Sequence, residues 1–255
     1  MDELPGRTAL ITGASNGIGA AIAVRYARHG MRVAVHYHSN ERGARETQSC
    51  MATNPQGEHP LLRADVADPG QVRGLVQEAT LLLGRLDVLV NNAGIFEDTP
   101  FTTTDYADWQ AGWRRTLDIN LMSAVNATYC ALPAMRAQGG GKVINIASRS
   151  AFRAETNAPA YAVSKAGMVN LTRCLARAEA VNDILSYCIA PGWVETAMAR
   201  EGMEQMAADV LSQIPLGRIA SVEDVAGVAL FLASDAANYL TGITIPVTGG
   251  SWMST

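Results

Sequence analysis

Apolar residues along this chain follow two alternating patterns. Short runs rich in valine, isoleucine and leucine predict buried strands at residues 8–12, 32–37, 61–64, 88–91, 142–147, 185–190 and 243–247. Between these runs, apolar positions recur every three or four residues, which predicts helices at residues 18–29, 41–51, 69–83, 106–138, 159–181 and 222–233.

Strands joined by helical crossovers pair in parallel, because a tight hairpin cannot connect parallel neighbours. The predicted strands are almost wholly apolar, as in a sheet covered on both faces. No internal repeat and no Pro-, Gly- or Ser-rich linker divides the chain. The expected fold class is α/β: a single Rossmann-type domain over residues 1–255, with a doubly wound parallel sheet of about seven strands and helices on both faces.

One segment interrupts this alternation. Residues 195–215, between the sixth strand and the last helix, carry Met198, Met203 and Met206 among alanine and acidic residues. Flexible methionine side chains suit a small helical insert that closes over a site, so we expect a lid here. A plain surface excursion is the alternative.

The composition is typical of a packed soluble domain, with 48% hydrophobic and 17% charged residues. A formal net charge of −4 provides no attraction to nucleic acid or to an anionic membrane surface. No window of about 20 residues is continuously apolar, and the N-terminal sequence lacks the basic and apolar regions of a secretory signal. We therefore expect a cytoplasmic protein with neither nucleic acid nor membrane as a partner.

The cysteines give no sign of a metal site. Cys50, Cys130, Cys174 and Cys188 form no CxxC pair, and each lies in an apolar or helical context. Reduced thiols are therefore the expectation, with no disulfide and no bound metal.

A glycine-rich turn follows the first predicted strand and leads directly into a helix. Such glycines let the backbone turn sharply and approach a pyrophosphate, while the helix N-terminus offers free N–H groups to the phosphates. The turn alone is a weak signal, but it stands in the strand–turn–helix context that a dinucleotide site requires. The residues expected to contact the cofactor are Gly13, Ser15, Asn16, Gly17, Ile18 and Gly19.

The end of the second predicted strand bears on the choice of cofactor. An NAD site of this kind carries an acidic residue there to hold the ribose. This chain instead has Tyr37, His38, Ser39 and Asn40, with no carboxylate before Glu41. The polar side chains can hydrogen-bond a 2′-phosphate, although no basic residue occupies the glycine-rich turn. NADP(H) is therefore favoured, and NAD(H) stays open.

Two further strand ends supply cofactor-binding candidates. Asp65 and Val66 follow the third strand, where a carboxylate can accept a hydrogen bond from an adenine amino group. Asp65 could instead cap the next helix, although Asp68 fits that cap better. Amide side chains after the fourth strand can bridge neighbouring strands beneath a cofactor, and a glycine lets the chain pass close to it. These residues are Asn92, Ala93 and Gly94.

The proton chemistry is predicted at Tyr161 and Lys165, which lie four residues apart and so share one helix face. A phenol, with a pKa of about 10, exchanges protons poorly at neutral pH, and we expect the ammonium to lower that pKa. Lys165 is one of only two lysines, the other being Lys142. Ser148 ends the fifth strand, at the edge where open α/β sheets bind ligands, and its hydroxyl can hold a substrate carbonyl.

Over essentially its whole length the chain resembles the short-chain dehydrogenase/reductase family. The residues that carry the resemblance are the glycine-rich turn, Asp65, residues 91–94, Asn120, Ser148, Tyr161, Lys165, Pro191, Gly192, Thr196 and the tail residues 240–250. The 13-residue interval from Ser148 to Tyr161 also matches that of the family.

The resemblance implies roles for these residues. Tyr161 would act as general acid and base, and Lys165 would lower its pKa and hold the nicotinamide ribose. Ser148 would orient the carbonyl, while Asn120 would support a water relay to Lys165. Family members usually form tetramers through the two long helices, so a homo-oligomer is expected. The nicotinamide side of the cofactor is expected to contact Pro191, Gly192, Val194 and Thr196.

The predicted reaction transfers a hydride between nicotinamide and a small-molecule carbonyl or secondary alcohol. The overall pattern resembles 3-oxoacyl-carrier-protein reductases, so a ketone or 3-oxoacyl reductase is favoured. A sugar or polyol dehydrogenase of the same family is the alternative. A non-catalytic dinucleotide-sensing protein is a third hypothesis, disfavoured by the complete catalytic set. Specificity candidates are Arg149, Arg153, Glu155 and Trp193, although solvated surface positions are the default expectation for the two arginines.

Overall fold

Seven strands form one parallel sheet in the computed structural model, which describes residues 4–102, 105–196, 198 and 209–253. The strands are β1 Thr8–Ile11, β2 Arg32–Tyr37, β3 Leu61–Arg63, β4 Val88–Asn91, β5 Gly141–Ile146, β6 Ile184–Pro191 and β7 Thr244–Val247. Their order in the sheet is β3-β2-β1-β4-β5-β6-β7. The winding direction reverses between β1 and β4, so the doubly wound sheet that the sequence predicts is confirmed, and each strand end lies within one residue of its prediction.

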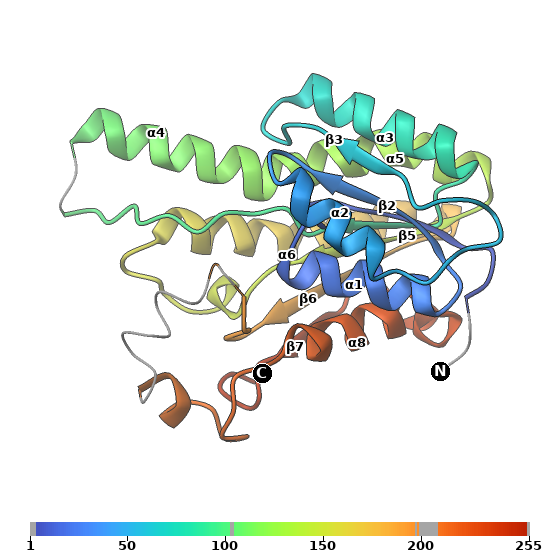
Figure 1. Cartoon of the computed structure of the whole chain (residues 1–255). Coiled ribbons are helices and arrows are strands. Elements are labelled where there is room, and N and C mark those ends of the chain that lie inside the picture. Colours follow the sequence, from blue (N-terminus) through green and yellow to red (C-terminus); the bar gives the residue numbers. More distant parts are fainter. Residues whose placement is uncertain (1–3, 103–104, 197, 199–208, 254–255) are drawn as a thin grey trace.

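Helices cover both faces of the sheet. Their bounds are α1 Gly17–Arg28, α2 Glu41–Ser49, α3 Pro69–Leu83, α4 Tyr106–Leu117, α5 Ser123–Ala137, α6 Pro159–Glu179 and α8 Val222–Ala233. One core lies between the sheet and helices α1 and α8, and a second lies between the opposite face and helices α3 and α5 (Figure 1). Helix α6 packs on the same face as α5. The lid expected over residues 195–215 lies largely outside the described residues.

The helix predicted over residues 106–138 is helical without a break from Tyr106 to Ala137, but it is not a uniform α-helix. A π-helical turn, Asp118–Met122, separates α4 from α5 and wraps one additional residue into the helix. The chain stays helical through this turn, so the spacing of apolar positions hardly reveals it. Turns of this kind occur frequently at functional sites, and the buried residue at the centre of this one is Asn120.

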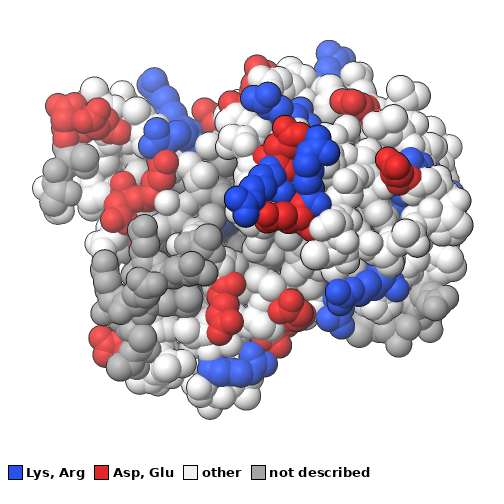
Figure 2. Space-filling view, in the orientation of Figure 1, with Lys and Arg blue, Asp and Glu red and all other residues white. Residues whose placement is uncertain are grey.

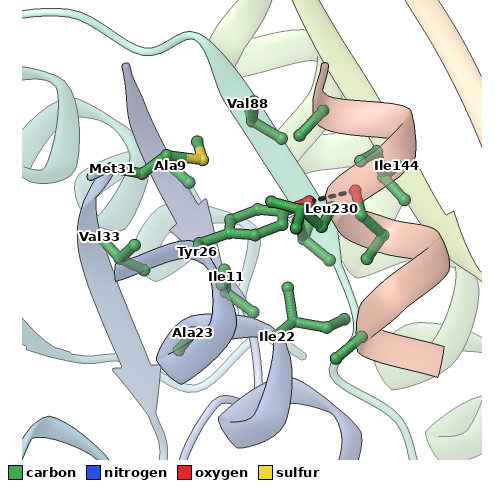
Figure 3. Packing of buried hydrophobic residues seen from close by; sticks show 14 of the residues in the cluster. Ala9, Ile11, Ile22, Ala23, Tyr26, Met31, Val33, Val88, Ile144 and Leu230 are labelled. Atoms are coloured by element: carbon green, nitrogen blue, oxygen red, sulfur yellow. Dashed lines mark hydrogen bonds between the residues drawn. The ribbon is translucent and has the colours of Figure 1, made fainter. Parts of the chain in front are cut away.

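Tyr26 of α1 joins the two helices on one face of the sheet. Its ring is fully buried among Ile11, Met31, Val33 and other apolar side chains (Figure 3). The hydroxyl donates a hydrogen bond of 2.9 Å to the carbonyl oxygen of Ala229 in α8. Burial raises the pKa of Tyr26 far above its ordinary value. The phenol therefore stays neutral and combines apolar packing with one satisfied polar contact.

Lys142, one of the two lysines, has a structural position at the amino end of β5. Its Nζ donates a hydrogen bond of 2.5 Å to the carbonyl oxygen of Ser234, just beyond the end of α8, and lies over the ring of Tyr187. Burial lowers the pKa of Lys142 to about 8. Catalytic groups gather at the opposite, carboxyl edge of parallel strands. Of the two lysines, Lys165 is therefore the functional candidate and Lys142 is a structural residue.

The charged surface shows no patch of a single sign on the face drawn in Figure 2. Over α2, Arg42 pairs with Glu46 and Arg45 pairs with Glu41, so that acidic and basic side chains alternate. In the part of the chain that the structure describes, no helix combines the length and the apolar character needed to cross a bilayer.

We predict that Tyr26→Phe lowers the free energy of unfolding by about 1 kcal/mol, because it removes the hydrogen bond to Ala229 and keeps the ring. Urea denaturation at a fixed protein concentration measures the change. Tyr239→Phe is the matched control, since Tyr239 is fully exposed. Equal midpoints for the two variants would show that the buried hydroxyl contributes nothing.

Candidate active site

The turn after β1 is locked to the loop after β4. The Thr12 hydroxyl oxygen accepts hydrogen bonds from the backbone N–H groups of Asn92 and Ala93, at 2.9 and 3.0 Å. The Asn92 side chain donates to the carbonyl oxygens of Thr12 and Gly13, both at 2.9 Å. Gly13 has a φ of +65°, and a Cβ there would lie 2.9 Å from the Cα of Ala93. The two loops therefore meet at the reversal point of the sheet, in contact that only glycine allows.

Gly19, in the first turn of α1, extends this close contact. A Cβ on Gly19 would lie only 2.4 Å from the carbonyl oxygen of Gly13 and 2.5 Å from Nδ2 of Asn92. Asn16, the N-cap residue of α1, makes no side-chain capping hydrogen bond. The first N–H groups of the helix thus remain available to an anionic ligand such as a pyrophosphate. Thr196, predicted on the nicotinamide side, lies beside Gly17 of the same turn.

His36, which the sequence pattern did not single out, supports the glycine-rich turn through a hydrogen bond. Its Nδ1 accepts a hydrogen bond of 3.0 Å from the N–H of Gly13, so its Nε2 carries the proton and donates to the carbonyl oxygen of Ala64 at 3.1 Å. Burial lowers the pKa of His36 to about 4, which keeps the ring neutral. The sequence feature that could have drawn attention to His36 is a single histidine within an apolar strand. Such a histidine is far more often a buried structural residue than a functional one.

The end of β2 places Tyr37 half-buried and His38, Ser39 and Asn40 at the exposed surface. Asn40 has a structural task as well, because its side-chain oxygen accepts a hydrogen bond of 3.0 Å from an N–H in the first turn of α2. Arg63 of β3, which was not predicted, donates from Nε to the carbonyl oxygen of His38 at 3.2 Å. A guanidinium group therefore lies beside the polar residues expected to meet a 2′-phosphate.

Asp65 and Asp68 divide their tasks as expected. Asp68 caps α3 by accepting hydrogen bonds from the N–H groups of Gly70 and Gln71. The Asp65 side chain accepts only a local hydrogen bond from Ala67 and is half-buried beside the buried Val66. Asp65 is therefore not required as the helix cap and has carboxylate capacity left for a ligand.

Asn120 fixes the chain beyond β4 from the π-helical turn. Its side-chain oxygen accepts a hydrogen bond of 2.8 Å from the N–H of Ile95, and its Nδ2 donates to the carbonyl oxygen of Ile95 at 2.9 Å. Nδ2 also lies 3.2 Å from the hydroxyl of Ser164 in α6. This fully buried amide therefore joins the loop after β4 to the helix that carries Tyr161.

Lys165 lies next to this amide. Its side chain is buried, and Nζ donates a hydrogen bond of 2.9 Å to the carbonyl oxygen of Ile146 at the end of β5. A Cβ on Gly94 would lie 3.4 Å from this nitrogen and 3.2 Å from the Asn120 oxygen, so the three predicted residues are neighbours. Burial lowers the pKa of Lys165 to about 8.

The low pKa expected for Tyr161 is not found in the polypeptide alone. Burial raises the pKa of Tyr161 above its ordinary value, and a hydrogen bond with Ser148 opposes this only in part. The lysine nitrogen lies 5.7 Å from the centre of the tyrosine ring. Desolvation of the phenol therefore dominates in the protein alone, and the hydroxyl is held as a proton donor.

Ser148 completes the cluster at the carboxyl end of β5. Its hydroxyl accepts a hydrogen bond of 3.1 Å from the N–H of Ser150, which fixes the side chain at the start of a short 3-10 turn. Phe96, which the sequence analysis missed, packs edge-on against the Tyr161 ring at 5.0 Å between ring centres. Tyr161 therefore lies within the influence of the Ser148 hydroxyl, with the Phe96 ring against one side of its own.

The loop after β6 lies beside the last strand of the sheet. Pro191 ends β6, and the N–H of Gly192 donates to the carbonyl oxygen of Val247 at 2.9 Å. Val194 is buried and pairs with Ala220 as an isolated bridge. The chain then continues past the carboxyl ends of the strands to Thr196, which lies beside Gly17 of the glycine-rich turn.

The residues predicted to set substrate specificity differ in how deeply their side chains are buried. Arg153 is exposed, as expected of a surface arginine, and Glu155 accepts a hydrogen bond of 2.8 Å from the Ser150 hydroxyl. The default expectation of a solvated position is wrong for Arg149, which is only 6% exposed. Its guanidinium carbon lies 5.3 Å from the ring centre of Trp193, and this stacking explains how the side chain is held inside.

Comparison with known proteins gives consistent results. Residues 13–251 match a family model described as enoyl-(acyl carrier protein) reductase. An uncharacterized short-chain type dehydrogenase/reductase of Sinorhizobium fredii is 36% identical over 97% of this chain and 98% of its own. The 3-oxoacyl-[acyl-carrier-protein] reductase FabG of Staphylococcus aureus is also 36% identical, with the same coverage. A structure provisionally described as an NAD(P)-dependent gluconate 5-dehydrogenase of Beutenbergia cavernae, with NADP bound at low occupancy, has a TM-score of 0.87 and 38% identity over 98% of both chains.

We predict that Gly19→Ala abolishes dinucleotide binding, because its methyl group would displace the Gly13 carbonyl or the Asn92 side chain. Quenching of tryptophan fluorescence by added NADPH measures the affinity. Gly74→Ala is the matched control: Gly74 also lies in a helix, nothing lies within 4 Å of its Cβ position, and alanine stabilises a helix by up to about 1 kcal/mol. Normal binding by the Gly19 variant would contradict the assignment of the turn.

Proposed function

This chain belongs to the short-chain dehydrogenase/reductase family, whose members are NAD(P)-dependent oxidoreductases of CH–OH and C=O groups, and we propose that it reduces a ketone or 3-oxoacyl compound with NADPH. The observation that carries the proposal is the grouping of the Ser148 and Tyr161 hydroxyls with buried Lys165, whose Nζ lies 5.7 Å from the centre of the Tyr161 ring. These groups lie at the carboxyl edge of the sheet, where open α/β folds bind ligands.

The residues present fit a dinucleotide. Gly13 and Gly19 form a tight turn in which a Cβ would clash with the neighbouring chain, and the N-terminus of α1 is left without a side-chain cap. Gly94 keeps the loop beyond β4 close to Lys165. We assign the pyrophosphate to the turn, the adenine to Asp65 and the nicotinamide side to the loop from Pro191. The nicotinamide would supply or accept the hydride.

The chain's own residues account for the proton chemistry. The hydroxyl groups of Ser148 and Tyr161 would hold the substrate oxygen between them and stabilise the negative charge that develops there. Because burial keeps the Tyr161 phenol protonated, it is ready to donate its proton to that oxygen in the reduction. Lys165, with a pKa of about 8, is mostly charged at neutral pH and stabilises the phenolate that forms.

The similar proteins point to two classes of substrate. The resemblance to a 3-oxoacyl-[acyl-carrier-protein] reductase supports reduction of a 3-oxoacyl group. The structural similarity to a protein described as a gluconate 5-dehydrogenase supports a sugar or polyol instead. A purely sensing protein would have no use for a complete set of Asn120, Ser148, Tyr161 and Lys165.

We also propose that copies of this cytoplasmic chain associate into a tetramer through α4, α5 and α6. Large apolar side chains on these helices are exposed and would be covered in such an assembly. They include Tyr106, Met122, Tyr129 and Val163.

Tyr161→Phe is expected to lower the rate of ketone reduction at least about a hundredfold, because it removes the proton donor. Loss of NADPH absorbance measures the rate, and fluorescence titration checks that the dinucleotide still binds. Tyr239→Phe, on a fully exposed tyrosine outside the proposed interface, should keep full activity. Turnover near that of the wild type in the Tyr161 variant would reject the proposed mechanism.

We predict a preference for NADPH over NADH that depends on Arg63. Arg63→Gln should weaken NADPH binding about tenfold and leave NADH binding unchanged, because charge-assisted hydrogen bonds to the 2′-phosphate are lost. Arg42→Gln is the control, since Arg42 is exposed and already paired with Glu46. Equal losses for both dinucleotides, or a wild-type preference for NADH, would refute the assignment.

A further inference from the structure

Arg149 is a buried cation with no charged partner among the described residues. It directly follows Ser148 and opens the 3-10 turn Arg149–Ala151. The side chain is 6% exposed, and Nη1 is buried without a hydrogen-bond partner. The ion pairs formed within the described part of the chain do not include it. A guanidinium in this state is costly, because burial removes water without supplying an acceptor.

The surrounding side chains do not compensate for this charge. Trp193 offers its ring face to the guanidinium at 5.3 Å, which is attractive but supplies no hydrogen-bond acceptor. Arg153 adds repulsion, and burial together with that repulsion lowers the pKa of Arg149. Glu155 is the nearby acid that acts against this shift, and one of its oxygens accepts the hydroxyl of Ser150. The cluster therefore retains an excess of positive charge.

Trp193 adds a second unused donor. Its indole Nε1 is also buried without a hydrogen-bond partner. Trp193 directly follows Gly192, in the loop assigned to the nicotinamide side, while Arg149 directly follows Ser148. Two unsatisfied donors thus belong to the two chain segments that flank the reacting carbonyl. Each buried donor without a partner in a folded protein needs an explanation, and a bound ligand group is one such explanation.

We propose that Arg149 binds a carboxylate of the substrate, so that the natural substrate is an oxo acid or its hydroxy acid rather than a thioester or a neutral sugar. This inference rests on the proposed function, which places the reacting carbonyl at Ser148. Arg149 directly follows Ser148 in the chain, so its side chain is attached one residue from the group that would hold the reacting oxygen. A planar guanidinium matches the two oxygens of a carboxylate.

Two substrates with the same reacting carbonyl test the proposal: 3-oxobutanoate and its methyl ester. The wild-type protein should reduce the free acid with a kcat/KM at least about tenfold higher than the ester, since a hydrogen-bonded charge pair is worth that factor or more. Arg149→Met should remove this preference by lowering kcat/KM for the acid alone. Arg153→Met, on the exposed neighbour, should preserve it.

Two results would overturn the proposal. One is a wild-type preference for the ester. The other is an equal loss on acid and ester in Arg149→Met, which would assign Arg149 a purely structural role beside Trp193. Should the methionine variant fail to fold, Arg149→Lys keeps a point charge without the planar fork. It should then reduce the acid preference while leaving the ester unaffected, and an equal loss on both would again overturn the proposal.

A binding measurement separates this inference from the proposed mechanism. In Tyr161→Phe protein saturated with NADP⁺, calorimetry compares 3-hydroxybutanoate with its methyl ester, without turnover. The acid should bind at least about tenfold more tightly, and Arg149→Met in the same background should abolish the difference. Equal binding overturns the role of Arg149 even when the wild type reduces neutral ketones. Acid-selective binding without any wild-type turnover would instead reject the proposed mechanism and leave the carboxylate site in place.

Discussion

The close contact between the ends of β1 and β4 determines where every functional group of this chain lies. Thr12 and Asn92 exchange hydrogen bonds across the reversal point of the sheet. Gly13 and Gly19 leave no room for a side chain in this contact. The contact fixes the mouth of the cofactor cradle and the direction in which the chain leaves β4, toward Asn120 and Lys165. A displacement here would move the cofactor and the proton donor relative to one another.

Buried amides extend this constraint through the sheet to α6. Asn91 donates a hydrogen bond of 2.8 Å to Asn145 of β5, which in turn donates to the hydroxyl of Thr172 in α6 at 2.8 Å. A buried polar network of this kind holds its members rigidly, because any break leaves a buried donor without a partner. Helix α6 carries Tyr161 and Lys165, so the network fixes the position of the helix that bears these side chains relative to the strands. Site geometry and core stability therefore rest on the same side chains.

The fold could be predicted, and the trio proposed to be catalytic could be picked out, because both leave strong local patterns. Strands covered on both faces are apolar throughout, and Asp68 followed by a proline marks a helix start. The π turn at Asn120 escaped prediction because one additional residue hardly changes apolar spacing. The burial of Arg149 and the hydrogen bonds of His36 depend on segments distant in the sequence. The raised pKa of Tyr161 likewise reflects desolvation, which the spacing to a lysine cannot express.

The central claim is that Tyr161 is the proton donor and acceptor, held as a neutral phenol by burial and responsive to nearby positive charge. The direct test is the pKa of Tyr161, followed by NMR of protein labelled with ¹³C at the tyrosine ring, with and without saturating NADP⁺. The Tyr161→Phe spectrum would assign the resonance. The account predicts a pKa above the ordinary value of 10.0 in the protein alone, and a lower one when the positively charged nicotinamide is bound. A Tyr161 pKa that is ordinary in the free protein and unmoved by NADP⁺ would contradict it.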